Sequence, residues 1–193
     1  MDVWTSFSNV LSAFGLSSAA GLNAYIPLLA IGLLDRFGYL TLQSPFDLLS
    51  STAGLIIVAV LAILDFVADK VPAVDHVVHV IGGFVSPVAG AIAFASQNNL
   101  ISEIHPVLAL ATGFLMAGGF HATRAAIRPV ATTTTAGVAN PVLSFIEDLL
   151  SLLLSVLAFF APLIAVGLLL LLIVLLVRSW RSIRRRAATL RRS

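Results

Sequence analysis

The sequence contains no cysteine and very little charge. The absence of cysteine excludes disulfides, thiol catalysis and thiolate metal sites. Only 10% of the 193 residues are charged and 59% are hydrophobic, whereas a soluble globular domain carries about 25% charged residues. With a mean hydropathy of +1.05, this composition predicts an all-α, integral membrane protein.

Long apolar segments recur along the chain. Residues 149–177 contain no charge, and about 20 apolar residues suffice for a helix to cross the hydrocarbon core. Short polar or Pro/Gly/Ser-rich pieces separate the segments. We expect one polytopic domain over residues 1–178 with six to seven transmembrane helices, at residues 4–18, 22–38, 51–69, 74–97, 104–126, 142–160 and 162–178.

The last two segments are separated only by the residues around Pro162. Pro141 to Val177 is 37 residues, which would measure about 55 Å as one helix, against a hydrocarbon core of about 30 Å. We therefore expect a tight hairpin at Pro162. The short first segment, 4–18, is also compatible with a re-entrant or interfacial helix.

Acidic residues are absent from residues 178–193, which hold seven arginines. The remaining 177 residues carry four bases against nine acids, a net charge of −5. Positive charge gathers on the cytoplasmic side and is attracted to anionic lipid. Residues 179–193 are thus expected to form a cytoplasmic tail, with the N-terminus outside. Nucleic acid is not an expected partner, because no folded basic domain accompanies the tail.

Two stretches of small and hydroxylated residues interrupt the apolar pattern, "LSSAAGLNAY" at 16–25 and "ATTTTAGVAN" at 131–140. An interrupted helix at membrane depth exposes backbone polar groups that a water-containing cavity can satisfy. Both stretches are therefore candidate walls of a polar pathway; the alternative is close helix packing through small residues. The candidate residues are Ser17, Ser18, Asn23, Thr133, Thr134 and Asn140.

The two stretches also align with each other. Residues 17–23 can be laid over residues 133–139, and each precedes a long apolar segment on the same predicted side. This correspondence predicts an internal 3+1+3 repeat, in which the fourth span links two parallel sets of three. The alternative is a chance match between two Ala/Gly/Ser/Thr-rich stretches.

Ionisable residues gather at the predicted cytoplasmic ends of the spans. Asp65 and Asp69 are four residues apart, as are Asp75 and His79, so each pair shares a helix face. A charged side chain at mid-helix costs about 2.5 to 3.5 kcal/mol on insertion, and such a residue is a functional candidate by default. The candidates are Asp65, Asp69, Asp75, His79, His121, Arg124, Glu147 and Asp148.

Glu147 and Asp148 lie inside the sixth expected span. Adjacent helix positions point about 100° apart, so one acid can face a pathway while the other pairs with a neighbouring helix. A purely structural ion pair is the alternative. The partners available on the same side are Lys70, His121, Arg124 and Arg128.

A divalent metal is the one cofactor that these residues suggest. Asp65, Asp75 and His79 offer oxygen and imidazole ligands that suit Mn²⁺, Mg²⁺ or Zn²⁺, although histidines also serve as hydrogen-bonded helix residues or proton carriers. The sequence lacks the G-x-S-x-G, P-loop and H-E-x-x-H motifs. These absences favour a protein that is not an enzyme.

Three separated motifs carry a resemblance to a known family: "AAGLNAYIPLLAIGLLDRFG", "DFVADKVPAVDH" followed by "VSPVAGAIA", and "HATRAAIRPVATTTTAGVANPVLSFIEDLLS". In this order they are similar to the bacterial membrane-protein family known as domain of unknown function 4126. The resemblance implies a polytopic protein of the bacterial inner membrane without an established activity. It also implies an acid near His79 and a basic residue near Ser86, so both residues depart from the family pattern here.

Three functions are compatible with these residues. The leading hypothesis is a small transporter or channel, for a cation or coupled to protons, because an acidic membrane body favours cations. The alternative is a non-catalytic membrane scaffold or accessory subunit. A further alternative is an enzyme that acts on a lipid-linked phosphate through a divalent ion at Asp65, Asp69 and Asp75. Small-residue faces such as 113–119 also permit a homo-oligomer.

Overall fold

The chain folds into a bundle of α-helices. The computed structural model describes residues 3–68, 72–97, 105–135 and 138–190. These ranges hold seven α-helices and a short 3₁₀-helix: α1 (Val3–Leu22), α2 (Tyr25–Arg36), η1 (Phe46–Leu49), α3 (Thr52–Ala68), α4 (Pro72–Ala95), α6 (Pro106–Thr135), α7 (Asn140–Phe160) and α8 (Pro162–Leu190). The all-α class is confirmed, and the α-helices follow the expected segments in order.

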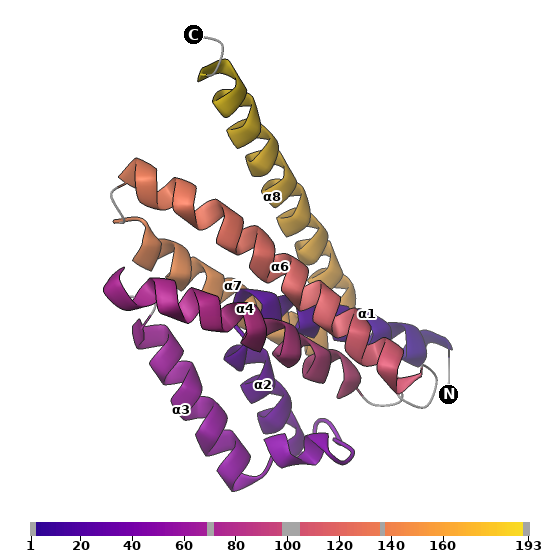
Figure 1. Cartoon of the computed structure of the whole chain (residues 1–193). Coiled ribbons are helices and arrows are strands. Elements are labelled where there is room, and N and C mark those ends of the chain that lie inside the picture. The colour runs from indigo at the N-terminus through magenta and orange to yellow at the C-terminus, as the bar shows by residue number, and fades with distance from the viewer. Residues whose placement is uncertain (1–2, 69–71, 98–104, 136–137, 191–193) are drawn as a thin grey trace.

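Helix α1 lies at the centre of the bundle, against α2, α4, α6, α7 and α8 (Figure 1). Its second half, residues 12–22, is almost entirely buried. A Cβ added at Gly15 would lie 2.7 Å from the Cβ of Ala158 on α7, and one added at Gly21 would lie 2.5 Å from the Cβ of Phe120 on α6. Small residues on α1 therefore allow the neighbouring helices to approach closely.

The serines of α1 take part in this packing. Ser12 donates to the carbonyl of Ala158 at 2.5 Å, and Ser17 donates to the carbonyl of Gly113 at 2.8 Å. Ser18 donates to a carbonyl one turn back in α1. The expectation of an interrupted helix at Ser17 and Ser18 is wrong, because α1 is continuous there and both hydroxyls are buried among backbone carbonyls.

The second Ser/Thr-rich stretch is also mostly helical. Helix α6 continues through Pro129 to Thr135, well beyond the expected end at residue 126. Thr133 and Thr134 thus belong to its last turn, and α7 begins at Asn140. Threonine hydroxyls in a helix can bond to the carbonyl one turn back, as Thr132 does with Arg128 at 3.0 Å. The 3+1+3 repeat stays a prediction.

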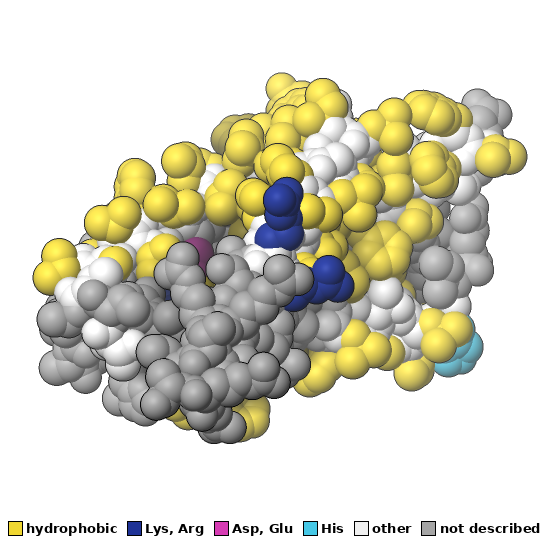
Figure 2. All heavy atoms as spheres, turned by 90° about the horizontal axis from the view of Figure 1, so that it is seen from above, with side chains coloured by type: hydrophobic (Ala, Val, Ile, Leu, Met, Phe, Trp, Pro, Cys, Tyr) yellow, Lys and Arg dark blue, Asp and Glu magenta, His cyan; other side chains and the backbone are white. Residues whose placement is uncertain are grey.

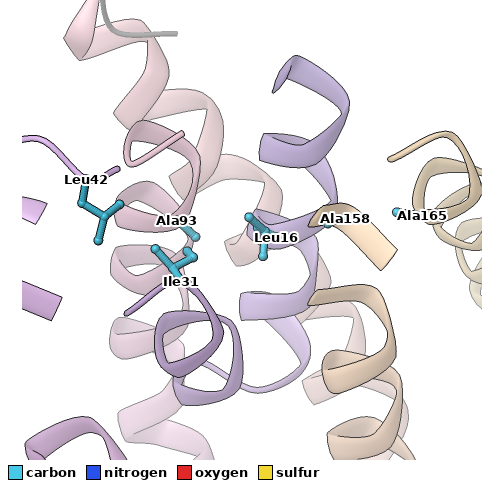
Figure 3. Packing of buried hydrophobic residues seen from close by; sticks show 6 residues of the cluster. All are labelled: Leu16, Ile31, Leu42, Ala93, Ala158 and Ala165. Atoms are coloured by element: carbon cyan, nitrogen blue, oxygen red, sulfur yellow. The ribbon is translucent and has the colours of Figure 1, made fainter. Parts of the chain in front are cut away.

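A hairpin joins α7 and α8, as expected at Pro162. Helix α7 ends at Phe160, and Ala161 leaves the helical region with φ −147° and ψ 68°. Proline suits the first position of α8, where its missing N–H costs no hydrogen bond. The two helices pack against each other. Near the hairpin, Ala158 and Ala165 lie on one side of Leu16, and Ile31 and Ala93 lie on the other side, in a small apolar core (Figure 3).

Helices α2 and α8 also differ in length from the expected segments. Helix α2 has 12 residues, about 18 Å at 1.5 Å per residue, and the chain then turns at Gly38, whose φ of 77° suits glycine. Beyond this turn Leu42 returns to the core. Helix α8 has 29 residues, about 43 Å. It continues past residue 178, where the membrane domain was expected to end and the basic tail to begin.

Large apolar side chains lie on the outside of the bundle. Phe84 is 77% exposed, Leu115 72% and Ile63 63%. Outside the part drawn in grey, Figure 2 shows a mostly apolar face with charged side chains as isolated spots. Within the described residues, two helices are long and apolar enough to cross a membrane, and three shorter ones are apolar; their ranges are Pro106–Pro129 and Asn140–Phe160, then Thr52–Ala68, Val80–Ala95 and Pro162–Leu175.

Candidate functional site

The chain breaks its helical course at Asn23 and Ala24, between α1 and α2. The side-chain Oδ1 of Asn23 accepts hydrogen bonds from the backbone N–H groups of Tyr25 at 2.9 Å and Ile26 at 3.2 Å. This side chain therefore caps the start of α2, because it satisfies N–H groups that have no partner within the helix. The break lies within the expected stretch, residues 16–25, at the candidate Asn23 and five residues after Ser18.

The same Asn23 amide joins two carboxylates. Its Nδ2 donates to Oδ2 of Asp65 on α3 at 3.1 Å and to Oδ1 of Asp148 on α7 at 2.9 Å. Because Oδ1 faces two N–H donors, the orientation of the amide is fixed and both of its own N–H groups point to the acids. The two accepting oxygens are at most about 6 Å apart, within the range where like charges interact.

A second group of charges lies on α6 and α7. Oε2 of Glu147 accepts from Nη2 of Arg128 at 2.7 Å and lies 3.1 Å from Nε of Arg124. These three side chains are only 17%, 6% and 10% exposed, respectively. Arg124 also donates through Nη1 to the carbonyl of Leu22, the last residue of α1. A cation suits this position because the helix dipole places partial negative charge there.

These two groups together form what we call the central polar site. It carries three acids and two arginines, a net charge of −1 over its six residues. Its members are Asn23, Asp65, Arg124, Arg128, Glu147 and Asp148.

Two hollows adjoin the central polar site. The first, of about 240 Å³, lies between α2, α3, α4 and α6, and Asn23, Asp65, Arg124 and Ser86 line it. The second, of about 310 Å³, lies between α2, α3 and α7; Asn23 and Asp148 line it together with apolar side chains. Asn23 therefore borders both hollows.

The expectation that Glu147 and Asp148 point in different directions is confirmed. Asp148 faces Asn23, whereas Glu147 faces the two arginines of α6. Arg124 had been expected at the site; Arg128 had been named only as an available partner. The structure shows that Arg128 is as closely involved, four residues further along the same helix face.

Helix α7 turns a polar face towards the bundle. The candidates drawn from the sequence do not include the serines of this face. Its buried polar residues follow one another at intervals of three or four, and Ser151 donates to the carbonyl of Ala19 on α1 at 3.0 Å. This periodicity is visible in the sequence and would have added three serines to the candidates. The buried polar face consists of Asn140, Ser144, Asp148, Ser151 and Ser155.

The other candidate residues lie around this centre. His121 is buried on α6 and packs against α4, where a Cβ on Gly82 would lie 2.9 Å from its Cε1. Asn140 begins α7 and donates through Nδ2 to Oγ1 of Thr132 at 3.0 Å. Thr133 is exposed in the last turn of α6. Asp69 lies outside the described residues, as do the side chains of Asp75, His79 and Thr134.

The metal hypothesis finds no support within the described ranges, where no three or more His, Asp or Glu side chains form a group that could hold an ion. Asp65 instead bonds to the Asn23 amide. The other two ligands expected from the sequence, Asp75 and His79, have side chains that fall in the part left undescribed.

Residues 10–182 match the family described as "Domain of unknown function (DUF4126)". The chain belongs to this family. The resemblance inferred from the three motifs is thereby confirmed, and the match covers the whole central polar site of this DUF4126 member. No curated protein and no solved structure matches the chain.

Proposed function

We propose that the chain is an integral protein of the bacterial inner membrane, crossed by the helices of the bundle. The exposed large apolar side chains support this location, together with the two long apolar helices. Burying a Leu or Phe side chain is worth about 1.5 to 3 kcal/mol, so an aqueous surface of this kind would be costly. A lipid environment removes that cost.

The arginines of the C-terminal segment set the proposed orientation. Helix α7 runs away from the Arg128–Glu147 pair, and α8 returns from the hairpin at Pro162 towards the same end of the bundle (Figure 1). The positive-inside bias places this end in the cytoplasm. The central polar site then belongs to the cytoplasmic half of the protein, and the tail binds anionic lipid at that face.

Within this membrane body, the chain functions as a small transporter or channel for a cation, or one coupled to protons. The observation that supports this proposal is the single amide of Asn23 that bonds both Asp65 and Asp148 between two hollows. The oxygens of the two carboxylates that accept from this amide are at most about 6 Å apart. Two acids at this separation attract a proton or cation that enters between them.

The arrangement also offers a route. The first hollow reaches Asp65, the second reaches Asp148, and Asn23, whose amide bonds both acids, borders the two hollows. A cation passes from one carboxylate to the other when this side chain moves aside. Glu147 has a different role, because two arginines hold it and it keeps α6 and α7 together.

Ion flux into liposomes that contain the purified protein tests this function. Under an imposed proton, Na⁺ or K⁺ gradient, we expect wild-type flux above that of empty liposomes and at least a tenfold loss in Asp65→Asn and Asp148→Asn. Asp47→Asn is the matched control, because Asp47 is exposed on η1, away from the central polar site. Wild-type flux equal to that of empty liposomes, or flux that neither substitution at the site lowers, would refute the proposal.

A scaffold or accessory subunit is the second candidate. The close packing around Gly15 and Gly21 and the Glu147 ion pairs favour it, since both stabilise a fixed bundle. This role requires a partner protein. Recovery of the chain only within a larger complex, with no flux by the chain alone, would favour the scaffold over the transporter.

A further inference from the structure

An apolar groove separates α6 from α8 on the outside of the bundle. It has a volume of about 600 Å³, and its walls include Leu115 and Met116 of α6 and Ile173 and Val177 of α8. At one end Phe120 of α6 and Leu169 of α8 belong to the same buried apolar cluster. From there the two helices diverge towards the C-terminal end of α8 (Figure 1).

The groove combines an apolar interior with a positive end. Arg181, an exposed residue of α8, belongs to its lining and follows Val177 by one helical turn. Thr123 also lines the groove, but its hydroxyl donates to the carbonyl of Gly119 at 2.8 Å and so bonds within α6. A suitable ligand therefore has a long apolar part and an anionic group at one end.

We propose that this groove binds one anionic phospholipid, with an acyl chain between α6 and α8 and the phosphate at Arg181. Guanidinium groups bind phosphate through paired hydrogen bonds, and acyl chains match the apolar walls. An apolar helix from a second copy would fill the groove but would supply no anion for Arg181. The inference rests on the proposed membrane location and is independent of transport.

Two glycines provide a matched pair of variants. A Cβ added at Gly119 or at Gly167 meets no atom within 4 Å, so both positions accept a side chain without a clash inside the bundle. Gly119 lines the groove, whereas Gly167 on α8 does not. Gly119→Leu therefore occupies the space of the acyl chain, and Gly167→Leu adds the same side chain elsewhere.

Native mass spectrometry of the delipidated protein in detergent, titrated with phosphatidylglycerol or phosphatidylcholine, tests the proposal. We expect one phosphatidylglycerol per chain, bound more tightly than phosphatidylcholine. Arg181→Gln should weaken it about fivefold, the effect of roughly one basic residue at a lipid surface. Gly119→Leu should abolish this binding and Gly167→Leu should retain it.

Three results would overturn the inference. They are equal binding of the two lipids, unchanged phosphatidylglycerol binding by Gly119→Leu, and a dimer that Gly119→Leu dissociates, which would assign the groove to a second copy. Carbonate extraction of the same variants from membranes reports their location separately. A chain that resists extraction but does not prefer phosphatidylglycerol to phosphatidylcholine therefore contradicts lipid binding in the groove. The proposed membrane location stays intact in that case.

Discussion

Replacement of Asn23 by alanine should destabilise the protein more than replacement of any ordinary polar residue in it. The side chain caps α2 through two backbone N–H groups and donates to Asp65 and Asp148. Loss of an Asn cap costs about 1 kcal/mol, and a hydrogen bond to a charged group is worth about 1.5 to 3 kcal/mol. Because both carboxylates can rearrange after the substitution, part of this cost is recovered. We therefore expect the free energy of unfolding to fall by about 3 to 5 kcal/mol in total.

Thermal unfolding of the purified protein in detergent measures this loss, with Asn140→Ala as the matched control. Asn140 also stands at the start of a helix, but its amide bonds to the neutral hydroxyl of Thr132. The control should therefore lose only about 1 kcal/mol. Equal midpoints of unfolding for the two alanine variants would refute the special role of Asn23.

Asn23→Asp separates the two roles of this side chain. Aspartate caps helices as well as asparagine does, so a residue needed only as a cap would tolerate the change. The substitution also replaces the donor that faces Asp65 and Asp148 by a third carboxylate, which repels both. We therefore expect Asn23→Asp to be at least as unstable as Asn23→Ala, and wild-type stability would show that the contacts with the two acids contribute nothing.

Three further substitutions test the packing around the site. Glu147→Gln should lower the free energy of unfolding by about 3 kcal/mol, because it leaves two buried arginines without their acid. Adding Arg128→Gln should recover part of this loss, and additive losses in the double variant would contradict the ion pair. Gly21→Ala should lower the free energy of unfolding by about 1 to 3 kcal/mol through overpacking against α6, whereas Gly167→Ala, in open space, should not. Ser17→Ala should lower the free energy of unfolding by about 1 kcal/mol and leave ion flux unchanged, because the Ser17 hydroxyl donates to a buried carbonyl. A loss of flux would show instead that Ser17 lines the pathway.

The positions of the helices could be predicted because each apolar segment is long enough for a helix and is bounded by polar or turn-forming residues. The hairpin at Pro162 followed from length alone, since residues 141–177 exceed the length of one membrane-crossing helix. The length of α2 did not follow from the expected segment, 22–38. Three residues are lost at its start, where the chain breaks at Asn23 and Ala24, and two at its end, where the chain turns at Gly38.

The acids of the site could also be predicted, because a carboxylate inside an apolar segment needs a reason. What the sequence did not reveal was which of them meet. Asn23 lies 42 residues from Asp65 and 125 from Asp148, and no local spacing records such a contact. The expected convergence of Asp65 with Asp69, Asp75 and His79 concerns side chains largely outside the described residues.

The helix break lies at Asn23 and not at the serines of the same stretch, for a physical reason that bears on function. Small residues weaken a helix and also let helices pack closely, so a Ser/Ala/Gly stretch alone does not distinguish a break from a packing seam. Asn23 decides the position here, because its side chain satisfies the start of α2 while Arg124 bonds the end of α1. The break therefore needs no water to satisfy the backbone at these ends. Any polar pathway then runs beside it, where Asp65 and Asp148 reach the two hollows, and the serine stretch of α1 serves as the packed wall behind.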